Sequence, residues 1–114
     1  MNKKSRGAWG EQIALDFLEK KGYIILDRNL WSAAGEIDII ARDTDTTVFV
    51  EVKVITAYGA GELEQIVSEK KQERIRNCAL LYLKQQYGTI EMSLRFDVIA
   101  IHNREEILHV ENAF

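Results

Sequence analysis

The sequence predicts an α/β fold, a three-layer sandwich in which a mixed sheet of about four to five strands is flanked by helices. Three observations predict it. Two segments carry apolar residues at helical spacing, several short segments are rich in β-branched residues, and small or polar residues separate them. Because 114 residues is the length of one ordinary domain, we expect residues 1–114 to fold as one unit.

Two helices are expected from the apolar periodicity. The first runs from about Ala8 to Lys21, and Gly22 follows where a left-handed C-terminal cap would fall. A second helical pattern starts at Leu63 after a glycine-containing loop. Ser68 is expected to cap a further segment, whose apolar stripe continues to Gly88.

The strands are expected in segments that lack a helical period. Tyr23–Leu30 predicts the first strand, and Glu36–Ala41 and Thr47–Val54 predict a hairpin around a polar turn. Met92–Ile101 is apolar on both alternations, which is typical of a strand buried on both faces, and Ile107–Val110 predicts an edge strand. The expected order is helix, three strands, helix, strand, strand.

Composition narrows the class of protein. A hydrophobic fraction of 46% beside 29% charged residues indicates a packed globular chain. The net charge of −3 argues against a uniformly basic, nucleic-acid-coating surface. A local basic group, Lys70, Lys71 and Arg74, is nevertheless a candidate phosphate contact, and a solvated helix face is the equally weighted alternative.

Neither an export signal nor a membrane span is predicted, so we expect a cytoplasmic protein with no membrane partner. The basic N-terminus is not followed by an unbroken apolar stretch, and the longest apolar runs are short. The lone cysteine, Cys78, falls among apolar residues of the second helix and is expected in the core.

The hairpin carries the charged pattern that points to chemistry. Period-two alternation places Glu51 and Lys53 on one face of their strand, and Glu36 and Asp38 on one face of the strand before it, with the isoleucines beside Asp38 on the other. If the hairpin is symmetric about its turn, Asp38 faces Glu51 and Glu36 faces Lys53. Four charged side chains would then share one face.

Directly opposed carboxylates repel each other, and a divalent cation between them would remove the repulsion. Mg²⁺ or Mn²⁺ bound by Asp38 and Glu51 would activate a water, and Lys53 would orient that water or neutralise charge developing on a phosphoryl group. The alternative is an exposed hairpin face, where Glu36 and Lys53 form an ordinary ion pair and the two carboxylates tolerate each other. The spacing by itself favours neither.

These residues also resemble a known signature. Gly35–Ile40 followed by Val48–Lys53 is similar to the D…(E/D)xK pattern of PD-(D/E)XK nucleases. More narrowly, the chain resembles the YraN-type family of small uncharacterised bacterial proteins, regarded as predicted endonucleases distantly similar to archaeal Holliday junction resolvases. The resemblance spans nearly the whole chain. It includes Gly7, Gly10, Glu11 and Ala14, then Lys70, then Arg95–Val98, and finally Asn112–Phe114.

The resemblance implies a restriction-endonuclease-like fold and a metal-dependent endonuclease acting on DNA, with branched or repair-associated structures as the implied substrates. It implies that Asp38 and Glu51 bind Mg²⁺ or Mn²⁺, that Lys53 is the catalytic lysine, and that Glu11 is an accessory carboxylate from the first helix. For Glu11 by itself, an acidic residue that complements the positive helix N-terminus is the simpler interpretation. Arg95 and Asp97 are expected to form a structural pair.

One departure from the family pattern supports a second hypothesis. The family pattern has an arginine two positions after the motif lysine in many members, whereas this chain has Val54 and Ile55 there. Together with the acidic net charge, the missing arginine favours a catalytically inactive nuclease-fold module that binds DNA or a partner protein. A homodimer is an expectation of the nuclease hypothesis, because cutting both strands of a duplex generally needs two sites.

Overall fold

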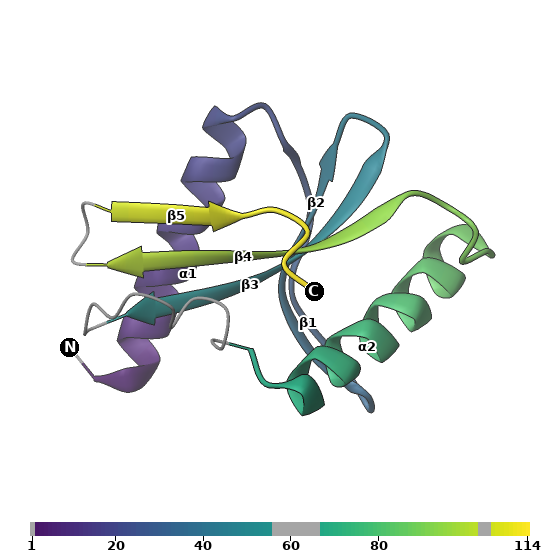
Figure 1. The fold of residues 1–114 in the computed structure, drawn as a ribbon, viewed down its shortest axis with the longest axis horizontal. Coiled ribbons are helices and arrows are strands. Elements are labelled where there is room, and N and C mark those ends of the chain that lie inside the picture. Colours follow the sequence, from purple (N-terminus) through teal and green to yellow (C-terminus); the bar gives the residue numbers. More distant parts are fainter. Residues whose placement is uncertain (1, 56–66, 103–105) are drawn as a thin grey trace.

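A computed structural model describes residues 2–55, 67–102 and 106–114 of the chain (Figure 1). It contains two helices and five strands in the order predicted from the sequence. Their bounds are α1 Lys3–Lys20, β1 Ile24–Ser32, β2 Gly35–Asp43, β3 Thr46–Ile55, α2 Glu69–Tyr87, β4 Leu94–His102 and β5 Glu106–Val110.

The strands form one mixed sheet with the order β1-β2-β3-β4-β5. Neighbouring strands are antiparallel except β3 and β4, which are parallel and lie on either side of α2 in the sequence. The two helices lie on opposite faces of this twisted sheet (Figure 1). The predicted α/β sandwich with three layers is therefore confirmed.

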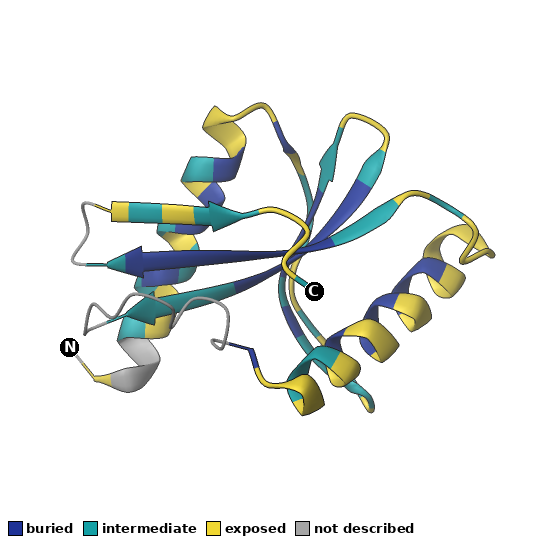
Figure 2. Cartoon of the chain, viewed as in Figure 1, coloured by how far each residue is buried: buried dark blue, intermediate teal, exposed yellow. Residues whose placement is uncertain are grey.

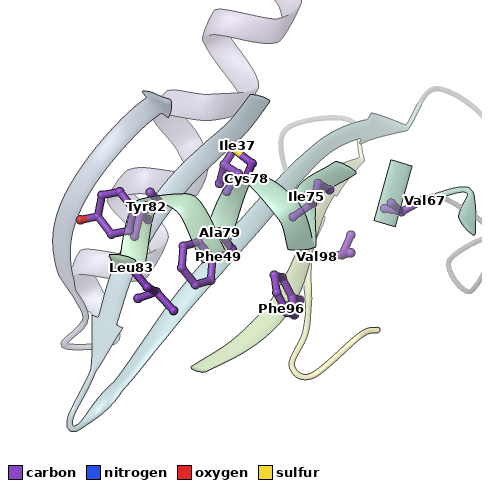
Figure 3. Packing of buried hydrophobic residues seen from close by; sticks show 11 residues of the cluster. Ile37, Phe49, Val67, Ile75, Cys78, Ala79, Tyr82, Leu83, Phe96 and Val98 are labelled. Atoms are coloured by element: carbon purple, nitrogen blue, oxygen red, sulfur yellow. The ribbon is translucent and has the colours of Figure 1, made fainter. Parts of the chain in front are cut away.

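Each helix buries its own apolar cluster against the sheet. Leu15 and Leu18 of α1 pack on one face, with residues such as Val50 and Ile99. On the other face, α2 covers Phe49 and its neighbours, and Cys78 is fully buried there, as expected for a core thiol (Figure 3). Burial of a large apolar side chain stabilises the fold by about 2 kcal/mol, so both layers contribute to stability.

The helix ends follow the predicted capping residues, with one difference at the start. Gly22 follows α1 with φ 92° and Gly88 ends α2 with φ 72°, both in the left-handed region that glycine adopts without strain. The Ser68 side chain caps α2 by accepting a hydrogen bond from the backbone of Lys71. Helix α1 begins earlier than expected, at Lys3. The helical pattern expected from Leu63 lies outside the described residues.

Strand β4 is mostly buried, as its sequence predicted (Figure 2). It also carries a buried network of charged side chains. The fully buried Asp97 accepts hydrogen bonds from Arg95 Nε and from the backbone N–H of Asn112, both at 3.0 Å. His109 Nε2 of β5 lies 2.7 Å from the same carboxylate. The structural pair of Arg95 and Asp97 is thus confirmed, and it fastens β5 and the following residues to β4.

The described helices include none that is long and apolar enough to cross a membrane.

Candidate metal centre

The predicted hairpin register is confirmed up to the proposed site. Ile39 pairs with Val50, and the pairing continues to Asp43 and Thr46 at the turn. Beyond this pair, the Val52 N–H donates a hydrogen bond of 2.8 Å to the Asp38 side chain, at its Oδ2 atom, instead of to the backbone of β2. The Asp38 side chain is therefore held between β2 and β3, where the two strands part.

The predicted alternation along β2 is wrong at this point. Ile37 packs in the cluster under α2, whereas Ile39 packs in the cluster under α1, so the two isoleucines lie on opposite faces. The β1 partner strand is also irregular here, since Asn29 adopts φ 51° opposite Asp38. The period of two therefore does not hold between Ile37 and Ile39, and Asp38 lies at this departure from regular alternation.

Glu51 is the buried carboxylate of the site. Only 5% of its side chain is exposed, and its Oε1 lies 2.5 Å from Lys71 Nζ and 3.8 Å from Lys53 Nζ. Burial and the nearby Asp38 charge raise the pKa of Glu51 to about 7, although both lysines act to lower it. The carboxylate thus carries a large desolvation cost that nearby positive charge reduces.

A pocket of about 190 Å³ opens where β2, β3 and α2 meet. The hairpin approaches α2 closely because Gly35 has φ 151° and no side chain, and a Cβ there would lie 3.3 Å from Arg74 Cβ. The pocket is lined by Gly35, Glu36, Asp38, Glu51, Lys71, Arg74 and Ile75.

Glu11 of α1 approaches the same carboxylates from the other helix. Its Oε1 is the buried side-chain atom that lacks a hydrogen-bond partner within the described residues. Burial raises the pKa of Glu11, and the neighbouring Asp38 charge raises it further. The Glu11 carboxylate therefore turns toward Asp38 and Glu36 of the hairpin.

Helix α1 comes close to the sheet because Gly10 has no side chain. A Cβ at Gly10 would lie 2.5 Å from Val54 Cγ2, which is closer than any real contact. Because Glu11 is the next residue, the same close approach brings its carboxylate to the site. Val54, which follows the motif lysine where the family pattern is basic nearby, is thus a packing partner of α1.

The predicted basic residues of α2 separate into two groups. Lys70 is exposed, whereas Lys71 and Arg74 line the pocket. The sequence predicted Lys71 as a phosphate contact and missed its pairing with Glu51. Helical spacing carried the signal, since Lys71 precedes the buried Ile75 by four residues and Cys78 by seven, on one face. Within the described residues, the ion pair of Lys53 is made with Glu51 and not with Glu36.

The donor atoms of this centre fit a hard divalent cation. Asp38 and Glu51 supply carboxylate oxygens to the pocket, which is the ligand type that a hard divalent cation prefers. Glu11 lies near Asp38 but does not line this pocket. The Lys71 ammonium already donates a hydrogen bond to one oxygen of Glu51, so this carboxylate is stabilised by a nearby positive charge.

A second group of ligand types lies in the β4–β5 network. One atom each of Asp97, His109 and Glu111 lie within 4.8 Å of one another. Their polar atoms already have protein partners, because Arg95 bonds both carboxylates and Lys21 Nζ lies 2.9 Å from His109 Nδ1. We therefore interpret this group as structural.

Comparison with known proteins gives the family. The model of a family described as "Uncharacterised protein family UPF0102" matches residues 10–101. The chain belongs to this family. It is 48% identical over 118 residues to a UPF0102 protein of Alkaliphilus oremlandii, with 100% of both chains covered. It is 42% identical over 117 residues to one of Geobacter metallireducens, covering 100% of this chain and 95% of that protein.

A UPF0102 protein of Thermodesulfovibrio yellowstonii is 44% identical over 111 residues, covering 95% of this chain and 94% of that protein. The UPF0102 model matches the chain from Gly10 of α1 to Ile101 of β4, which includes the whole hairpin and α2. The candidate centre and its neighbours, Glu11, Asp38, Glu51, Lys53 and Lys71, all lie within this segment.

Proposed function

We propose that this UPF0102 protein is a metal-dependent endonuclease that hydrolyses phosphodiester bonds in DNA. The observation that supports this most is that Asp38 and Glu51 line one pocket, with Lys53 Nζ 3.8 Å from Glu51 Oε1 and the Glu11 carboxylate near Asp38. Carboxylates that converge with a lysine are the groups that metal-assisted phosphoryl transfer requires. The PD-(D/E)XK resemblance of the same residues supports the reaction class.

Each residue has a role in this proposal. Asp38 and Glu51 would hold Mg²⁺ or Mn²⁺, and the hydrogen bond from Val52 fixes the Asp38 carboxylate in advance. When bound, the metal supplies Lewis acidity and lowers the pKa of a water. Lys53 is 36% exposed, so its ammonium can reach a phosphoryl oxygen while it stays near Glu51. Glu11 would add a further carboxylate near Asp38.

DNA is the proposed substrate, with branched or repair-associated structures as the preferred forms. Arg74 at the pocket and the exposed Lys70 on the same helix would contact phosphates beside the reacting one. Because a single pocket cuts one strand at a time, we also propose that two copies associate to cut a duplex. Sedimentation at micromolar concentration tests this, and a monomer there would restrict the protein to nicking.

One observation favours a second candidate, a catalytically inactive module that binds DNA or a protein. The Lys71 ammonium sits on Glu51, so this carboxylate has a counterion without any metal. A module of this kind would be indifferent to divalent cations.

Metal binding separates the two candidates. We expect Mn²⁺ to bind the wild-type chain with a stoichiometry of about one or two ions, measured by isothermal titration calorimetry. The variants Asp38→Asn and Glu51→Gln keep the shape of each side chain and should lose that binding. Asp45→Asn in the exposed hairpin turn is the matched control and should bind as wild type. Binding that persists in both site variants would rule out this metal centre.

Activity is tested on single-stranded, duplex and four-way-junction DNA with Mg²⁺ or Mn²⁺. Lys53→Ala should reduce cleavage by about 10²-fold or more, because it removes charge stabilisation at the reacting phosphate. Lys84→Ala, which removes an exposed lysine in the last turn of α2, is the control that should cleave normally. Inactivity of the wild-type chain on every substrate would favour the binding module.

A further inference from the structure

Lys71 lies where a helix would not by itself place a positive charge. It is in the first turn of α2, and its backbone N–H donates to the capping Ser68 at 3.2 Å. The N-terminus of a helix carries partial positive charge, which disfavours a lysine there. A second cationic residue, Lys53, approaches the same carboxylate. An opposing negative group must offset this repulsion.

Glu51 is that negative group. Its Oε1 accepts a hydrogen bond of 2.5 Å from Lys71 Nζ, the shortest ion-pair distance among the described residues. The glutamate is nearly fully buried, whereas 38% of the lysine side chain is exposed. The lysine can therefore move away into solvent, but the carboxylate on its central strand cannot follow.

We propose that Lys71 is a built-in counterion that competes with the divalent cation for Glu51 and thereby sets the metal affinity of the site. This inference rests on the proposed metal centre. Asp38 and Glu51 are held by the sheet, so a divalent cation bound to them would compete with the ammonium on Glu51 Oε1 for the same negative charge. The freed lysine stays tethered at the pocket that Arg74 also lines, where a DNA phosphate is its next available anion.

The test is the affinity for Mn²⁺ alone, measured by calorimetry and by electron paramagnetic resonance. Lys71→Met keeps most of the aliphatic stem and removes the ammonium, so it should bind Mn²⁺ about tenfold more tightly than wild type. Lys71→Arg keeps a competing cation and should bind as wild type. Lys70→Met removes the same charge from the neighbouring exposed position and controls for long-range attraction.

Thermal unfolding is a second test of the competition between Lys71 and Mn²⁺ for Glu51. Without metal, Lys71→Met leaves the buried Glu51 with only the more distant Lys53, so its melting temperature should fall. Saturating Mn²⁺ should restore stability, and the metal-induced rise in melting temperature should be larger than in wild type. If Lys71→Met does not fold, Lys71→Gln serves, because its neutral amide can still donate to Glu51.

The outcomes separate the inference from the function on which it rests. An affinity of Lys71→Met, or of the substitute Lys71→Gln, no higher than that of Lys70→Met would overturn the counterion role while leaving the metal centre intact. Failure of wild type and all variants to bind Mn²⁺ would overturn both. Tighter binding restricted to the neutral Lys71 variants supports competition.

Discussion

At the scale of single residues, the cost of burying Glu51 makes stability depend on pH. The pKa of this carboxyl group is about 7 in the folded protein, mainly because burial disfavours its charged form, against an ordinary value of 4.5. Between these values the folded state holds a proton that the unfolded state has released. Stability therefore falls as pH rises from about 4.5 to about 7.

Glu51→Gln should remove much of this dependence, because glutamine resembles the protonated form at every pH. We expect the variant to match wild type near pH 4 and to exceed its free energy of unfolding by about 3 kcal/mol at pH 8. Urea denaturation in chelator-containing buffer measures this, with the exposed Glu19→Gln as control. An unchanged slope in Glu51→Gln would assign the pH dependence to Glu11 and Glu36, whose pKa values burial also raises.

At the scale of elements, the absence of a side chain at Gly10 sets the distance between α1 and β3. Gly10→Ala should destabilise the protein by about 1–3 kcal/mol, because the new methyl group would meet Val54 Cγ2 at 2.5 Å. Alanine's better helix propensity offsets only part of this cost. Adding Val54→Ala removes the clash, so the double variant should be more stable than the sum of the single changes predicts.

Denaturation of the two single variants and the double variant measures that coupling. Additive losses would mean that α1 shifts away instead of clashing, which would also withdraw Glu11 from the site.

The buried network of β4 is expected to matter for stability and not for chemistry. Asp97→Asn should cost about 3 kcal/mol or more, because Arg95 and His109 would lose their shared carboxylate while they remain mostly buried. Hydrogen bonds from His109 and Arg95 lower the pKa of Asp97 in spite of its burial, so its contribution is present above pH 3.8 and is lost at lower pH. Denaturation at pH 7 and pH 3 tests both statements, with Asp45→Asn as the control. A loss below 1 kcal/mol would contradict the network's role.

At the scale of the whole molecule, the charge distribution predicts how DNA binds. With a net charge of −3, the chain as a whole repels a polyanion, so binding depends on the few cations at the pocket. In a Lys53→Ala background that blocks cleavage, Arg74→Ala should weaken duplex binding equally for all sequences. It should also lower the salt slope by about one. Fluorescence anisotropy at several salt concentrations measures this, and an unchanged slope would place the DNA elsewhere.

The sequence by itself determined the order of the elements, the caps at Gly22 and Ser68, and the hairpin register from the turn to the pair of Ile39 and Val50. These features depend on local periodicity, on backbone preferences at glycine, and on symmetric pairing about a short turn. Such signals lie within a few residues of one another along the chain.

Only the tertiary structure decided the direction of Asp38, the approach of Glu11 and the pairing of Lys71 with Glu51. Simple alternation fails around Asp38, because Ile37 and Ile39 pack on opposite faces of the sheet, under different helices. Lys71 meets Glu51 through the packing of α2 on the sheet, 20 residues away in sequence. Local sequence patterns do not encode contacts of this kind, because these contacts result from how whole elements pack against one another.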